Sequence, residues 1–154
     1  MGTLGYWGGQ MAIDGTWYNE LGSTMTITTS PEGTVAGQYV SLVGDAPGSY
    51  DLVGRFDSQQ VPGEVGTTVG WSVAWQNETT DVHSVTVWAG QYFDGGSERI
   101  MTTWLLDMQT SPENLWESTV VGQDMFGRIQ PTPQEVQNKL RLGAAASHPL
   151  RQRP

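Results

Sequence analysis

The sequence contains no cysteine, few basic side chains and no long apolar run. Without cysteine, disulfide bonds, thiolate catalysis and cysteine-based zinc sites are excluded. Seven Lys and Arg against sixteen Asp and Glu give a net charge of -9, so a nucleic-acid backbone would be repelled and is not an expected partner. No stretch approaches the roughly 20 apolar residues of a membrane-spanning helix, so a membrane is not expected as a partner either.

Glycine, tryptophan and β-branched residues are abundant instead, with 20 Gly and 7 Trp in the chain. This composition favours short strands joined by tight turns. Turn residues such as Pro31-Glu32-Gly33 and Asp94-Gly95-Gly96 separate about eight strand-like segments. Short links make neighbouring strands antiparallel, so we predict an all-β fold, an eight-stranded up-and-down barrel. The predicted strands are 15–19, 23–28, 34–41, 49–57, 67–75, 82–88, 100–106 and 118–126.

Two irregular regions flank the predicted barrel of residues 15–126. Residues 1–14 form a Gly-rich arm without the basic start and apolar stretch of a signal peptide. Residues 127–154 form a tail rich in Gln, Pro, Ala and basic residues. A short helix is predicted over 131–142, with Thr132 as N-cap and Pro133 at its first position. The rest of the tail has two interpretations: it is disordered, or it packs on a neighbouring subunit or enters the barrel mouth as a pseudo-ligand.

Alternation along the strands places Trp on the same faces as Ser, Thr, Tyr, Asn and Asp. Aromatic walls with a few fixed polar groups are typical of a small-molecule pocket, and an eight-stranded barrel is wide enough for one small ligand. From the pattern alone, a structural β-sandwich remains an alternative. The sets that share a face are Trp17 with Asn19, Tyr39 with Ser41 and Val43, Trp71 with Trp75, Ser84 with Thr86 and Trp88, Trp104 with Leu106, and Val120 with Asp124 and Phe126.

The same alternation argues against catalysis and indicates that part of the outer face is buried between subunits. A glycosidase would need two inward carboxylates, but only Asp124 is predicted to point inward, and no nucleophile–base pair is evident. We therefore expect no enzymatic activity. Two isolated His give no metal site. An outward stripe of Val85, Val87, Leu105 and Val121 favours burial against other subunits.

Several strings within residues 15–126 resemble the avidin/streptavidin family. They include Gly15-Thr16-Trp17-Tyr18-Asn19, Leu21-Gly22-Ser23-Thr24, Val73-Ala74-Trp75, Gly90-Gln91-Tyr92 and Trp104-Leu105-Leu106. The resemblance implies an eight-stranded barrel that sequesters biotin with high affinity, without a cofactor. It also implies a homo-oligomer, most often a tetramer, and a secreted or periplasmic location for a chain that lacks its signal peptide here. From the residues alone, an intracellular location and a different small ligand remain open.

The family's site can be carried over to this sequence residue by residue. Asn19, Ser23 and Tyr39 match the donors to the ureido oxygen, and Ser41 and Asp124 match the acceptors from the ureido nitrogens. Thr86 matches the contact to the ring sulfur, and Ser84 and the backbone N–H of Asp45 match the contacts to the carboxylate. The apolar contacts match Trp75, Trp88, Trp104, Leu21, Val43 and Leu106, with Trp116 lent by a neighbouring subunit. Asp45 stands where the family pattern has Asn, so its charge is expected to weaken binding or speed release.

Overall fold

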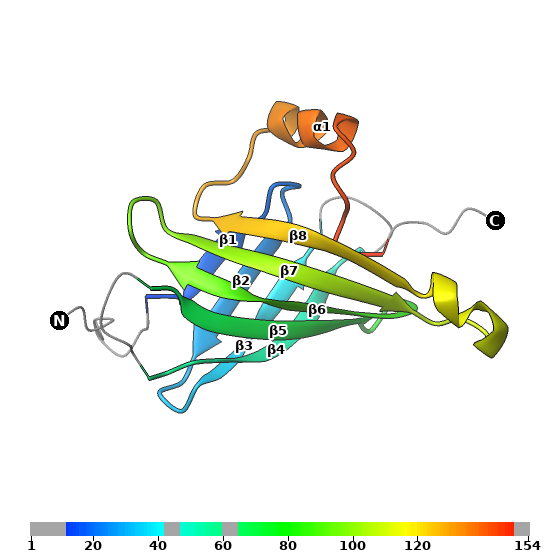
Figure 1. Cartoon of the computed structure of the whole chain (residues 1–154), viewed down its shortest axis with the longest axis horizontal. Helices are drawn as coiled ribbons and strands as arrows, with labels where there is room; N and C mark the ends of the chain where they lie inside the picture. Colours follow the sequence, from blue (N-terminus) through cyan, green and yellow to red (C-terminus); the bar gives the residue numbers. More distant parts are fainter. Residues whose placement is uncertain (1–11, 42–46, 60–64, 150–154) are drawn as a thin grey trace.

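The computed structural model describes residues 12–41, 47–59 and 65–149, and its main feature is a closed barrel (Figure 1). Eight strands pair antiparallel in chain order, and the last returns to the first through Tyr18 and Gly127. This confirms the predicted up-and-down barrel and excludes the sandwich of two sheets. The strands are β1 (Gly15–Tyr18), β2 (Thr24–Thr29), β3 (Thr34–Val40), β4 (Ser49–Phe56), β5 (Thr67–Gln76), β6 (Asp81–Phe93), β7 (Arg99–Met108) and β8 (Thr119–Gly127).

The predicted strand limits agree with the structure to within one or two residues, except in β6. This strand continues five residues beyond the predicted end at Trp88 and pairs with β7 as far as Arg99. Gly90 makes the extension possible, because a Cβ at this position would collide with the carbonyl group of Met101 on β7. Glycine at this position permits the close approach of the two backbones.

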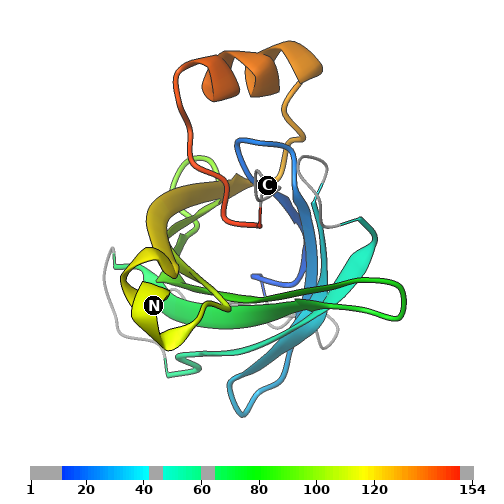
Figure 2. The ribbon, with the colours of Figure 1, turned by 90° about the vertical axis from the view of Figure 1, so that its right-hand side faces the viewer.

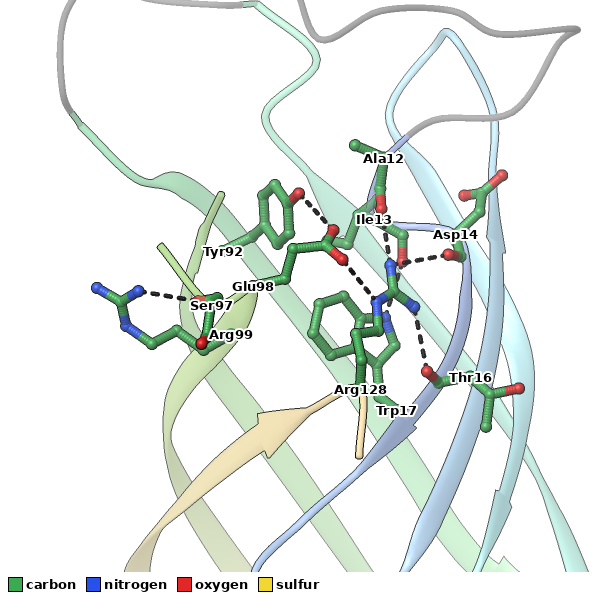
Figure 3. Close-up of polar contacts among 10 residues, drawn as sticks. All are labelled: Ala12, Ile13, Asp14, Thr16, Trp17, Tyr92, Ser97, Glu98, Arg99 and Arg128. Atoms are coloured by element: carbon green, nitrogen blue, oxygen red, sulfur yellow. Dashed lines mark hydrogen bonds and ion pairs between the residues drawn. The ribbon is translucent and has the colours of Figure 1, made fainter. Parts of the chain in front are cut away.

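One end of the barrel is closed by Arg128, the first residue after β8 (Figure 3). Its guanidinium carbon lies 3.6 Å from the centre of the Trp17 ring. The same group donates hydrogen bonds to the carbonyl oxygens of Ala12, Asp14 and Thr16 at 2.8–3.1 Å. A stacked cation that satisfies three backbone acceptors ties the start of the barrel to its end.

Outside the barrel, the tail forms the expected helix, α1 (Pro133–Arg141) (Figures 1 and 2). Thr132 is its N-cap and forms a capping box with Glu135, in which each side chain accepts the other residue's backbone N–H. The helix buries none of its residues. Gly143, with φ of +81°, ends it and turns the chain back towards the barrel. Among the described residues, no helix is long and apolar enough to cross a membrane.

Candidate functional site

The barrel interior combines indole and phenol rings with a small set of polar side chains. The alternation predicted from the sequence explains this, because every second residue of each strand points towards the barrel axis. Each of the interior positions expected from the family resemblance within the described strands and turns is buried. They are Asn19, Leu21, Ser23, Tyr39, Trp75, Ser84, Thr86, Trp88, Trp104, Leu106 and Asp124.

The tight turn between β1 and β2 fixes the orientation of Asn19. Its Oδ1 accepts the backbone N–H groups of Leu21 and Ser23 at 3.1 and 2.9 Å, and Gly22 supports the turn with φ of +81°. With its oxygen held by its own backbone, Asn19 directs its amide nitrogen into the barrel. There Nδ2 lies 3.3 Å from the Tyr39 hydroxyl. The turn therefore presents an oriented donor at the centre of the interior.

Asp124 on β8 is the charged group of this interior, with 2% of its surface exposed. Its Oδ2 accepts a hydrogen bond from the Trp88 indole at 3.0 Å and one from Asn19 Nδ2 at 3.5 Å. Its Oδ1 accepts none from an amide, indole or hydroxyl group of the described residues. A buried carboxylate oxygen without such a donor is costly, and a ligand N–H would remove that cost.

Aromatic side chains surround the polar groups and limit their solvation. The Tyr39 ring lies 5.6 Å from that of Trp75 and 5.2 Å from that of Trp88. Burial, reinforced by the charge of Asp124, raises the pKa of Tyr39 above its ordinary value, so its hydroxyl stays a neutral donor. The Trp75 indole donates to Thr86 Oγ1 at 2.8 Å. The arrangement can hold a small polar group between dry walls.

The end of the described chain fills part of this interior. After α1 the tail turns into the ring of strands (Figure 2), and Ala146, Ser147 and His148 are buried there. The Ser147 carbonyl accepts a 2.6 Å hydrogen bond from Thr86, and its hydroxyl lies 3.5 Å from that of Tyr39. The His148 ring meets the Trp75 ring edge-on at 6.3 Å. The tail thus contacts three of the expected site residues.

Four further positions were expected at the site, and two of them lie within the described residues. Trp116, in the 3-10 helix η1 (Pro112–Glu117), is 79% exposed. Ser41 follows β3 and is half-buried. Val43 and Asp45 lie outside the described residues.

One inward position and one contact differ from the sequence interpretation. Val120 was expected inside with Asp124, but it is 39% exposed because it lies at the rim, at the start of β8. Sequence reasoning missed Glu20, whose Oε2 accepts the Met125 backbone N–H at 3.1 Å. No sequence signal marks this contact, because Glu20 lies in a turn where alternation does not assign a face.

Sequence comparison with known proteins identifies a family and several relatives of this chain. A family model described as the Avidin family matches residues 8–129. Afifavidin of Afifella pfennigii is 36% identical over 134 residues, which cover 82% of this chain and 76% of afifavidin. Avidin-related protein 4/5 of Gallus gallus is 33% identical over 122 residues, which cover 77% of this chain and 78% of that protein.

Proposed function

The chain belongs to the avidin family, and from this membership we propose that it binds biotin non-covalently in the open end of its barrel. The observation that carries the proposal is Asp124, a buried carboxylate whose Oδ1 accepts no hydrogen bond from an amide, indole or hydroxyl group of the described residues. The ureido group of biotin offers two N–H donors and one strong acceptor oxygen. Such a group needs an acceptor and several donors that converge in a dry site.

The buried side chains suit the three parts of biotin. Asn19, Ser23 and Tyr39 would donate to the ureido oxygen, and Asp124 and Ser41 would accept the ureido N–H groups. Three convergent donors polarise the ureido group, and charge-assisted hydrogen bonds in a dry site are stronger than neutral ones. Trp75, Trp88, Trp104, Leu21, Leu106 and Val43 would form the apolar walls. Thr86 would contact the ring sulfur, and Ser84 and the Asp45 backbone the carboxylate.

Biotin and the tail would use the same groups. Thr86 and Tyr39, which hold Ser147, are also proposed contacts of biotin, and Trp75 packs against His148. Both ligands cannot occupy these groups together. Biotin therefore has to displace residues 146–148, and the tail acts as an internal competitor.

The outer wall favours assembly of several copies. Val85, Val87, Leu105 and Val121 are 40–60% exposed on neighbouring strands, as the alternation predicted. Their burial between subunits would form the homo-oligomer, a tetramer in our proposal. In that assembly Trp116, 79% exposed here, would close the site of a neighbouring subunit. We further propose that the protein is secreted or periplasmic and sequesters biotin without transforming it.

The alternative is a different small ligand in the same kind of barrel. A lipid-like molecule would suit a more apolar interior than one lined by Asn19, Ser23, Tyr39, Ser84 and Asp124. A ligand with the hydrogen-bonding pattern of a cyclic urea fits this polar set better.

Isothermal titration with biotin tests the proposal. We expect stoichiometric binding, and Asp124→Asn should weaken it by about 1.5–3 kcal/mol, the contribution of a charged hydrogen bond, or roughly 10- to 150-fold. Asp107→Asn, the same change at an exposed position on β7, is the matched control and should bind like the unchanged protein. Absence of heat and of thermal stabilisation at saturating biotin would exclude the function.

A further inference from the structure

Glu20 connects two elements that carry different parts of the proposed site. It lies in the β1–β2 turn beside Asn19, but its side chain reaches across to β8. There its Oε2 accepts the Met125 backbone N–H at 3.1 Å, and its carboxyl group shares a hydrogen bond with the side chain of Asp124. Glu20 therefore holds the turn against two consecutive residues of β8.

The two contacts require the Glu20 carboxyl group to act both as a hydrogen-bond acceptor and as a donor. The Met125 N–H needs an acceptor, whereas the Asp124 carboxylate, which already accepts N–H groups from Trp88 and Asn19, needs a donor. A protonated carboxyl group has one acceptor oxygen and one O–H donor, while an ionised one has acceptors alone. Burial, followed by the charge of Asp124, raises the pKa of Glu20 to about 7. The protonated form is therefore available near neutral pH.

Few other charges face Glu20. Asp124 is the acidic neighbour on β8, and Tyr39 on β3 is close enough to sense the charge of Glu20 but stays neutral. Lys139 of α1 lines the same open groove of about 740 Å³, between α1 and the outer wall of the barrel. Within the described part of the chain, no ion pair joins Lys139 to Glu20. Among the described residues, a second negative charge beside Asp124 would therefore have no ion-pair partner.

We propose that Glu20 is a positioning residue that latches the turn carrying Asn19 and Ser23 onto the strand carrying Asp124, through a proton held between two carboxyl groups. The proposal rests on biotin binding as proposed above. When the proton leaves, the O–H donor is lost and the two carboxylates repel each other. Asp124 is enclosed and cannot move away, so the turn shifts and its donors lose their alignment. Biotin then dissociates faster as the pH rises through neutrality.

Biotin dissociation from the full-length protein tests this mechanism. The protein is loaded with labelled biotin and chased with excess unlabelled biotin between pH 6 and 8.5, where the biotin carboxylate stays ionised. The tail is already displaced in the loaded protein, so His148 does not contribute to the measured rate. We expect the rate to rise several-fold across this range.

Variants separate the latch from general effects of pH. Glu20→Gln has the shape of the protonated acid, with an N–H donor for Asp124 and an oxygen for Met125. Its dissociation rate should stay flat and match that of the unchanged protein at pH 6, whereas Glu20→Ala should release biotin fast at every pH. Glu32→Gln, at an exposed position, should keep the full pH dependence. A flat profile in the unchanged protein, or the same slope in Glu20→Gln, would overturn the proposal.

Melting curves without biotin give a second readout that does not depend on the proposed function. A carboxyl group with a raised pKa in the folded state destabilises that state progressively as pH rises from about 4.5 to 7. The melting temperature of the unchanged protein should therefore fall relative to that of Glu20→Gln between pH 5 and 8. This difference supports the latch even if biotin fails to bind, and equal melting curves refute it.

Discussion

Removal of the internal competitor should speed biotin capture without changing biotin release. Truncation after Leu142 keeps α1 but deletes Ser147 and His148, which occupy the barrel in the structure. In the proposed competition, free and docked tail interconvert and only the free state admits biotin, so the apparent affinity is the intrinsic affinity multiplied by the fraction of open barrels. Truncation makes all barrels open.

The size of the effect can be estimated for one side chain of the tail. His148 meets Trp75 edge-on at 6.3 Å, and an aromatic contact of this kind contributes about 0.5–1.5 kcal/mol. His148→Ala should therefore weaken docking and raise the apparent biotin affinity by about 2- to 12-fold. Truncation should exceed this gain, because it also removes the Thr86–Ser147 hydrogen bond of 2.6 Å.

Stopped-flow measurement of tryptophan fluorescence follows association directly, since Trp75 and Trp88 line the site. Both tail variants should show faster association and an unchanged dissociation rate, because in the proposed competition biotin has already displaced the tail from the bound barrel. A synthetic peptide of residues 143–149, added to the truncated protein, should slow association again. A change in dissociation with unchanged association, or no change in either rate, would refute internal competition.

Two further predictions concern Trp116 and Asp45. Trp116→Ala should accelerate biotin dissociation and leave binding by an isolated subunit unaffected, because Trp116 is proposed to act on a neighbouring subunit; light scattering that finds a monomer would contradict this role and the tetramer together. Asp45→Asn should slow biotin release by raising the free-energy barrier to release by about 1 kcal/mol, because it removes a charge of the same sign as the biotin carboxylate. Equal release rates would show that the two charges do not approach.

Most interior residues of the site could be predicted from strand periodicity in the sequence. Tyr39, Thr86, Trp88 and Asp124 could be assigned to the interior because successive side chains of a strand alternate between faces, and barrel closure turns one face into an interior. Val120 shows the limit of this rule. Its parity is that of Asp124, but periodicity does not say where along a strand the enclosed volume ends.

Contacts outside the strands could not be predicted in the same way. Glu20 lies in a turn, and its contact with Met125 depends on how closely that turn approaches β8. Thr132 and Pro133 predicted where α1 begins, but the path of the chain beyond Gly143 depends on tertiary contacts with Tyr39 and Thr86. Local sequence encodes helix ends and strand faces, whereas docking of an irregular segment depends on the cavity that receives it.

The position of Arg128 has a consequence for how the protein can be handled. Arg128 holds Ala12 at the closed end of the barrel, whereas the last described residues of the chain lie in its mouth (Figures 2 and 3). The described chain therefore begins at the closed end of the barrel and ends inside the barrel, among residues of the proposed ligand site. A surface linkage at residue 12 itself would lie at the closed end, away from the proposed entrance. A protein fused after residue 149 would change how residues 146–148 occupy the barrel and would therefore alter ligand binding.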